Sequence, residues 1–208
     1  MRIGIIGAGA VGGTLARLWT NAGHEIAIAN SRGPDSLAEL VASLGPLVHA
    51  MTVDEVAAFG EVVVLAAPFR KPEAVPRSDL VKGKIVVDAM NPYAEGGGLL
   101  DLGGRPSGVV TAERLPGARV VKAFNTIHRD TLASAGRPYV PEEQRLVIFL
   151  AGDDARAKDR VAQLIREIGF APIDTGSLAI GGRLQEPGSK IFDQALLPSE
   201  ARHALARM

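Results

Sequence analysis

The stretch Arg2-Ile3-Gly4-Ile5-Ile6-Gly7-Ala8-Gly9-Ala10-Val11-Gly12 decides the fold of this 208-residue chain. Its first five residues form a short apolar run, which is typical of a strand buried on both faces. The pattern G-x-G-x-x-G follows at once. In such a unit the first glycine permits a tight turn, the second lets the backbone approach a pyrophosphate, and the third lets a helix pack against the strand. The sequence therefore predicts a dinucleotide-binding unit at the start of the chain.

An amphipathic helix and a second strand complete this unit. The apolar residues of the helix fall on one stripe, namely Val11, Leu15, Leu18, Trp19 and Ala22. Its unpaired N–H groups and positive dipole end would point at the phosphates. Gly23 ends the helix, and residues 24–29 alternate as a strand does. The alternative is a doubly wound domain that binds no ligand and whose glycines serve packing only.

The end of the second strand indicates which dinucleotide binds. An NAD site usually places Asp or Glu here to accept hydrogen bonds from the ribose hydroxyls. This chain instead has Asn30, Ser31 and Arg32, which offer a hydroxyl and a guanidinium to a 2′-phosphate. These residues favour NADP(H), although the same residues could also form a solvated turn before Pro34.

The remaining chain alternates predicted helices and strands. We expect helices at 36–44, 52–59, near 72–80, 109–115 and 153–168, with a modest one at the C-terminus; the first two begin with capping boxes, Ser36/Glu39 and Thr52/Glu55. We expect strands at 47–50, 61–67, 84–89, 119–124, 146–151 and 171–174, the last at an edge because of Pro172. Glycine-rich loops are expected at 91–117 and 176–190.

This order predicts an α/β fold with a doubly wound, mostly parallel sheet and a small C-terminal extension. We interpret residues 1–208 as one domain, with 1–124 as the dinucleotide-binding core and 125–208 as a smaller acceptor-side portion. Ligands of such sheets bind beyond the carboxyl ends of the strands. The loops after Ile6, Ala29, Ala67 and Ala89 should therefore face one crevice.

The composition excludes several other functions. Lys and Arg number 23 and Asp and Glu number 23, so nucleic acid or an anionic membrane is not expected as the main partner. The chain has no cysteine, which excludes disulfides, thiolate catalysis and cysteine-ligated zinc. The scattered histidines and carboxylates lack the spacing of a metal site. No apolar stretch approaches the roughly 18 residues of a membrane span, and a strand begins at the N-terminus, so we expect a cytoplasmic protein.

Few residues are candidates for acid–base catalysis. His128 follows a predicted strand and is a weak candidate; a solvated or structural role is the alternative. Tyr93 could line the pocket, and Lys122 could form a salt bridge. We therefore predict no dedicated catalytic residue.

Five motifs together resemble one family of enzymes. They are Gly7–Gly12, Asn30-Ser31-Arg32, Ala66-Ala67-Pro68, Lys122-Ala123-Phe124-Asn125-Thr126-Ile127 and Gly182-Arg183-Leu184-Gln185. The combination resembles the F420:NADP oxidoreductase family, the NADPH-dependent reductases of the deazaflavin coenzyme F420. It is also similar to the oxidoreductase domain of membrane metalloreductases that pass electrons from NADPH to flavin. The resemblance implies a Rossmann domain with a small C-terminal extension and a homodimer.

The resemblance also implies roles for individual residues. Those matching Ser31 and Arg32 hold the 2′-phosphate, the turn matching Pro68 lies by the nicotinamide, and the loop matching 125–127 lines the deazaflavin side. Asn125 stands where some members carry His. The identity of the hydride acceptor therefore stays open among F420, a flavin such as FMN or FAD, and another molecule. The predicted cofactor-binding residues are Gly7, Gly9, Ala10, Val11, Gly12, Asn30, Ser31, Arg32, Ala66, Ala67, Pro68, Asn91, Asn125, Thr126 and Ile127.

Our leading hypothesis is hydride transfer between NADP(H) and a flavin or deazaflavin, because such rings carry the redox chemistry themselves and need orientation more than a protein acid. The flat acceptor would lie between Pro68, residues 125–127 and the loop around Gly182, with Asn125 hydrogen-bonded to a ring carbonyl. One alternative is an imine or ketone reductase of the pyrroline-5-carboxylate reductase or β-hydroxyacid dehydrogenase type, whose usual helical dimerisation domain has little room here. Another is a non-catalytic NADP-binding sensor.

Overall fold

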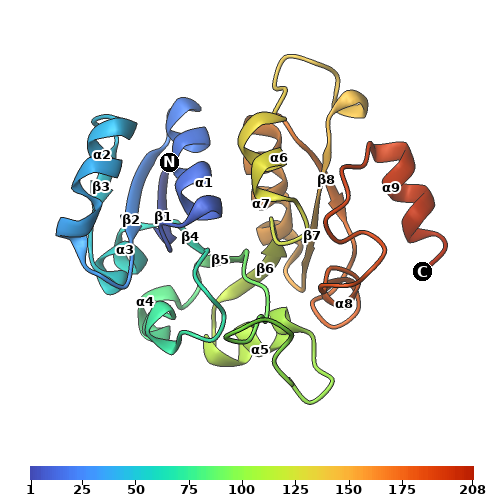
Figure 1. Cartoon of the computed structure of the whole chain (residues 1–208), viewed down its shortest axis with the longest axis horizontal. Helices are drawn as coiled ribbons and strands as arrows, with labels where there is room; N and C mark the ends of the chain where they lie inside the picture. Colours follow the sequence, from blue (N-terminus) through green and yellow to red (C-terminus); the bar gives the residue numbers. More distant parts are fainter.

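A single sheet of eight strands runs through the computed structural model, which describes residues 1–208 (Figure 1). The strands are β1 (Arg2–Ile6), β2 (Glu25–Ala29), β3 (Val48–Ala50), β4 (Val62–Leu65), β5 (Ile85–Asp88), β6 (Arg119–Ala123), β7 (Val147–Gly152) and β8 (Ala171–Asp174). Their order is β3-β2-β1-β4-β5-β6-β7-β8. All neighbours pair in parallel except β6 and β7. The prediction of a doubly wound, mostly parallel sheet is confirmed.

Helices cover both faces of this sheet. One hydrophobic core joins the sheet to α1 (Ala10–Asn21), α2 (Ala38–Leu44), α6 (Arg129–Ser134) and α7 (Ala155–Glu167). A second core joins the opposite face to α3 (Val53–Phe59), α4 (Ser78–Val81) and α5 (Ser107–Arg114). The last helices, α8 (Gly181–Leu184) and α9 (Pro198–Leu205), lie beside β7 and β8, and α9 forms the outer edge (Figure 1). Strands β4, β5 and β7 are buried along their whole length because both faces are covered.

Trp19 ties the first helix to the far side of the core. It is fully buried in α1, and its indole Nε1 donates to the carbonyl of Leu164 in α7 at 3.1 Å. Its ring and that of Phe124 are nearly perpendicular, with centroids 5.6 Å apart. Phe124 follows β6 with φ of +67°, a conformation that costs free energy in a residue with a side chain. This packing helps to hold the sharp turn from which residues 125–127 continue.

The two predicted capping boxes differ in outcome. At Thr52 the box forms: Thr52 Oγ1 accepts from the Glu55 N–H, and Glu55 Oε2 accepts from the Thr52 N–H at 2.9 Å. At Ser36 it does not form, because Ser36 lies inside a 3₁₀ turn, Pro34–Leu37, and its hydroxyl donates to the Gly33 carbonyl at 2.7 Å. The helix proper begins at Ala38. Pro34, the first residue of the 3₁₀ turn, has a fixed backbone angle that favours this turn ahead of the helix.

Two short helices, α6 and α8, were not predicted, and one predicted helix is two separate elements. Helix α8 lies within the loop expected at 176–190. A Cβ at Gly181 would clash with the Thr175 carbonyl oxygen, so this glycine serves close packing and not an open loop. The helix expected near 72–80 is a 3₁₀ turn, Pro72–Ala74, followed by α4, since Pro76 disfavours a continuous helix.

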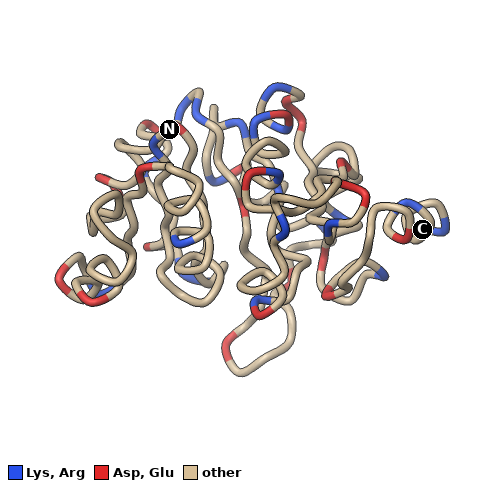
Figure 2. Tube along the Cα trace, turned by 90° about the horizontal axis from the view of Figure 1, so that it is seen from above, with Lys and Arg blue, Asp and Glu red and all other residues tan.

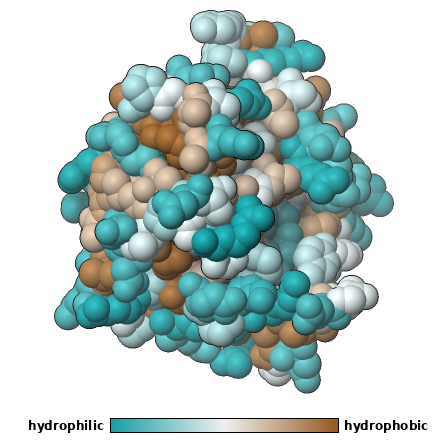
Figure 3. All heavy atoms as spheres, turned by 60° about the vertical axis from the view of Figure 1, so that its left-hand side comes forward, coloured by the Kyte–Doolittle hydropathy of each residue, from teal (hydrophilic) through white to brown (hydrophobic).

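Charges of both signs are spread along the chain. Basic and acidic residues are interspersed on most elements (Figure 2). The face in Figure 3 is largely hydrophilic, with small and separate hydrophobic areas. None of the helices has the length and apolar character needed to cross a membrane.

Candidate functional site

Two cavities lie at the carboxyl ends of the central strands. The first, called here the glycine-turn cavity, has a volume of about 380 Å³ and is lined by Ile6, Gly7, Ala8, Gly9, Asn30, Ser31, Arg32, Val53, Ala66, Ala67, Pro68, Lys71, Glu73 and Ala74. The second, called the Asn91 cavity, has about 290 Å³ and is lined by Val11, Ala66, Ala67, Pro68, Phe69, Arg70, Ala89, Met90, Asn91 and Tyr93. They share Ala66 to Pro68, directly after β4. Both lie beside the point where the strand order reverses, as ligand sites of such sheets do.

The three motif glycines have three different surroundings. Gly7 has φ of +115°, and a Cβ there would clash with Ala66. A Cβ on Gly12 would clash with the Gly7 carbonyl oxygen, so this glycine allows α1 to pack on the turn. Around Gly9, by contrast, a Cβ would meet no atom within 4 Å. Packing therefore requires the first and third glycines, whereas the second borders open space in the cavity.

The N-terminus of α1 opens on the same space. Gly9 is its N-cap residue and supplies no side-chain hydrogen bond, and the first turn contains no acidic residue. The first N–H groups of the twelve-residue helix thus have no side-chain acceptor. Such an end favours an anion such as a phosphate.

Within the turn after β2, Asn30 and its neighbours have separate roles. Asn30 Oδ1 accepts from the Arg32 N–H at 2.9 Å, and Asn30 Nδ2 donates to the Ser36 hydroxyl oxygen at 2.8 Å. Asn30 therefore shapes the turn, as Asn commonly does, and its amide is already engaged. The side chains of Ser31 and Arg32 are exposed and make no hydrogen bond or ion pair within the chain. They remain available to a ligand in the glycine-turn cavity.

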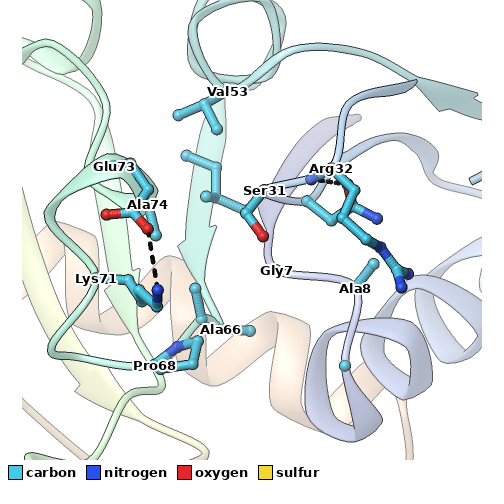
Figure 4. Close-up of a pocket in the computed structure, with 14 residues that line it drawn as sticks. Gly7, Ala8, Ser31, Arg32, Val53, Ala66, Pro68, Lys71, Glu73 and Ala74 are labelled. Carbon is cyan, nitrogen blue, oxygen red and sulfur yellow. Dashed lines mark hydrogen bonds and ion pairs between the residues drawn. The ribbon is translucent and has the colours of Figure 1, made fainter. Parts of the chain in front are cut away.

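The opposite wall of this cavity was not predicted. It is formed by Val53 and by Lys71, Glu73 and Ala74, which come from the segment after β4 (Figure 4). Lys71 and Glu73 form an ion pair at 3.5 Å. The rule that ligands bind beyond strand ends pointed to this segment, because Pro68 lies only three residues before Lys71. Sequence spacing could not show that the chain then turns back along the cavity.

The Asn91 cavity has mainly apolar walls. Phe69 is held there by Arg114, whose guanidinium lies 4.4 Å from the ring centroid and whose Nη1 donates to the Phe69 carbonyl at 3.2 Å. Tyr93 lines this cavity, as the sequence suggested. Partial burial, and then the nearby charge of Asp193, raise the pKa of the Tyr93 phenol. The phenol therefore stays protonated at neutral pH and can donate a hydrogen bond.

Asn125 does not line the Asn91 cavity itself but is hydrogen-bonded to Asn91, which does. Residues 125–127 are buried and line neither cavity. Asn125 Nδ2 donates to Asn91 Oδ1 at 3.1 Å and to the Gln185 carbonyl at 2.8 Å, while Asn91 Nδ2 donates to the Asn125 carbonyl at 2.9 Å. Both amide hydrogens of Asn125 are thus engaged, so the expected hydrogen bond from Asn125 to a ring carbonyl is wrong for this arrangement. Asn125 instead positions Asn91; Gly182 likewise lines neither cavity.

A fully buried ion pair lies beneath the same turn. Lys122 Nζ is 3.2 Å from Asp88 Oδ2 and also donates to the Met90 carbonyl. Asp88 further accepts from the Thr111 hydroxyl at 2.7 Å and from the Met90 N–H at 3.0 Å. The predicted salt bridge of Lys122 is confirmed. It fixes the Met90–Asn91 turn because both partners also bind the backbone of Met90.

His128 lies away from both cavities. Its ring Nδ1 accepts from the Asp130 N–H at 3.3 Å and so caps α6, and its side chain is half exposed. No group of three or more potential metal-ligating side chains occurs in the structure. Among the predicted cofactor-binding residues, those that line a cavity are Gly7, Gly9, Val11, Asn30, Ser31, Arg32, Ala66, Ala67, Pro68 and Asn91; those that do not are Ala10, Gly12, Asn125, Thr126 and Ile127.

Comparisons with known proteins agree with this arrangement. Residues 2–92 match the model of a family described as "NADP oxidoreductase coenzyme F420-dependent". The chain is 32% identical over 181 residues to metalloreductase STEAP3 of Rattus norvegicus, covering 86% of this chain and 34% of that protein. It therefore spans about a third of that relative.

Two solved structures are similar over nearly their whole length. A hypothetical protein from Sinorhizobium meliloti is 38% identical, covers 95% of each chain and has a TM-score of 0.81. A protein described as a candidate F420-dependent NADP reductase from an Arthrobacter species is 28% identical, covers 94% of this chain and 99% of its own, and has a TM-score of 0.73. The similarity extends through the C-terminal part as well as the glycine turn.

Proposed function

We propose that the chain transfers a hydride between NADP(H) and a flat acceptor ring, either a deazaflavin such as coenzyme F420 or a flavin such as FMN or FAD, because residues 2–92 match the family of NADP oxidoreductases described as coenzyme F420-dependent. The chain is an NADP-dependent oxidoreductase. One observation carries the finer proposal: the cavity at the glycine turn and a mainly apolar cavity without a histidine or lysine share one wall, Ala66 to Pro68. Homodimer formation and a cytoplasmic location stay predictions.

The residues of the glycine-turn cavity fit the phosphorylated half of NADP(H). Gly9 leaves space beside the N-terminus of α1, where a pyrophosphate can accept from backbone N–H groups. Ser31 and Arg32 lie at the same cavity, with a hydroxyl and a guanidinium for the 2′-phosphate. Apolar contacts from Val53 and Ala74 suit an adenine base.

The Asn91 cavity fits the nicotinamide half. Val11, Pro68 and Met90 line it with apolar side chains, which suit a ring held away from water. Asn91, held by Asn125, and the protonated phenol of Tyr93 offer hydrogen bonds that orient ring substituents. The bound nicotinamide supplies the hydride, and the protein contributes position and exclusion of water.

A change of cofactor preference tests the 2′-phosphate site. Wild-type protein should bind NADPH more tightly than NADH by about one to two decades, because a charge-assisted contact contributes roughly 1.5–3 kcal/mol. The double variant Ser31→Asp/Arg32→Ala should reverse this preference, since the new carboxylate repels the phosphate and accepts from the ribose hydroxyls. Titration calorimetry with both cofactors measures it. Equal dissociation constants in the wild-type protein would show that the phosphate is not bound at this turn.

A second pair of variants tests the acceptor side. Asn125→Ala leaves Asn91 and the Gln185 carbonyl without their donor, so kcat/KM for the acceptor should fall about tenfold while NADPH affinity stays within about threefold. His128→Ala is the control: it should leave turnover unchanged and cost about 1 kcal/mol of stability as a lost helix cap. Steady-state kinetics with each acceptor measure both. If His128→Ala removes turnover and Asn125→Ala is neutral, an acid–base enzyme replaces this proposal.

A further inference from the structure

Lys71 is a cation on the glycine-turn cavity to which the motifs assign no role. Its backbone is fixed from both sides, because its N–H donates to the Pro68 carbonyl at 2.9 Å and its carbonyl accepts from the Ala74 N–H at 3.0 Å. Its side chain is half exposed. Figure 4 shows Lys71 and Glu73 on one side of the cavity, with Ser31 and Arg32 on the other. The cavity thus has a cationic side chain on each wall.

Glu73 holds the Lys71 ammonium in this structure. The two charged groups are 3.5 Å apart, and both side chains are half exposed. The pKa of Glu73 is lowered, chiefly by a hydrogen bond from its own backbone N–H, so this carboxylate is ionised at neutral pH. An exposed pair of this kind is weak, and Lys71 can leave it at little cost. Glu73 itself carries the wrong charge for a cavity that accepts phosphate.

We propose that Lys71 is a second specificity-determining cation for the phosphorylated end of NADP(H), and that it exchanges the Glu73 carboxylate for the 2′-phosphate when the cofactor binds. This inference rests on the proposed function, which puts that phosphate in the glycine-turn cavity. The two cations suit different tasks. Arg32 offers a planar, rigid set of donors on the fixed β2 turn, whereas Lys71 is a compact charge on a flexible stem that can reach from the other wall. Glu73 weakens binding because its charge competes for Lys71 and repels the phosphate.

The test compares the dissociation constants of NADPH and NADH for single variants. Lys71→Met keeps the apolar stem and removes the charge, so NADPH should bind about fivefold more weakly while NADH changes less than twofold. Glu73→Gln should bind NADPH about twofold to fivefold more tightly, again with little change for NADH. Lys82→Met is the matched control, because Lys82 is exposed and lines neither cavity. Both effects should shrink between roughly 20 and 500 mM salt, as screening predicts.

Arg32→Ala separates this inference from the proposal on which it rests. Suppose that Arg32→Ala selectively weakens the binding of NADPH, but Lys71→Met changes the affinity for neither cofactor or for both equally. The proposed role of Lys71 is then wrong, and the proposal that the 2′-phosphate binds in this cavity stands. If Arg32→Ala also leaves the preference for NADPH unchanged, the phosphate does not bind in this cavity and both statements fail.

Discussion

Replacing Gly9 by valine should abolish measurable NADPH binding while the protein stays folded. The valine side chain would project into open space, because no atom lies within 4 Å of the position that a Cβ would take at Gly9. That space is the one that a pyrophosphate needs beside the N-terminus of α1. A Cβ at Gly9 displaces no protein atom, so the fold should tolerate the change. Valine is a poorer N-cap than glycine, and we expect a loss of stability of no more than about 1 kcal/mol.

Calorimetry with NADPH and a thermal melt of the same sample measure the two parts of this prediction. Gly13→Ala is a matched control, because Gly13 lies one turn further along α1 and a Cβ there meets only the Ala8 carbonyl oxygen, at 3.9 Å. That variant should bind as the wild type does. Normal NADPH affinity in Gly9→Val would show that the dinucleotide binds elsewhere.

Replacing Lys122 by methionine should have the largest effect on stability. The ammonium and the Asp88 carboxylate are both fully buried, and the ammonium alone neutralises that charge. Removal of one partner of a buried pair typically costs 3–5 kcal/mol, so we expect a loss of about 3–5 kcal/mol in the free energy of unfolding. Urea denaturation measures it.

The double variant Lys122→Met/Asp88→Asn separates the charge effect from the loss of packing. It should recover much of the loss, because no uncompensated charge stays buried. Lys84→Met is the control: Lys84 donates to the carbonyls of Ala57 and Ala58 but has no carboxylate partner, so it should cost only about 1 kcal/mol. A loss as small as this for Lys122→Met would mean that the pair does not hold the turn beneath the Asn91 cavity.

Local chemistry made much of the fold predictable. The apolar run before Gly7 and the capping box at Thr52 need only neighbouring residues, and both form as expected. The box at Ser36 failed because Ser36 lies inside the 3₁₀ turn after Gly33, where its hydroxyl donates to the Gly33 carbonyl and accepts from Asn30, both outside the expected helix. Helix α8 was missed because Gly181 is required by packing against Thr175, which no local pattern reveals.

The motif residues of the site could be predicted from the sequence, but the contacts between distant residues could not. The glycine turn and residues 30–32 sit at strand ends, and the strand order brings them together. The role of Asn125 was not predictable, since which atoms of an amide are engaged depends on Asn91 and Gln185, far away in the sequence. Lys71 was missed for a similar reason: its place on the cavity depends on the path of the chain after β4.

The most direct test of the central proposal is the steady-state oxidation of NADPH with F420, FMN, FAD and a small cyclic imine, each offered separately and each repeated with NADH. The proposal predicts turnover with at least one flat ring acceptor, faster with NADPH than with NADH, and none with the imine. The flat ring would take the hydride directly, with orientation supplied by the Asn91 cavity. Turnover of the imine alone, or tight NADPH binding without turnover of any acceptor, would contradict it.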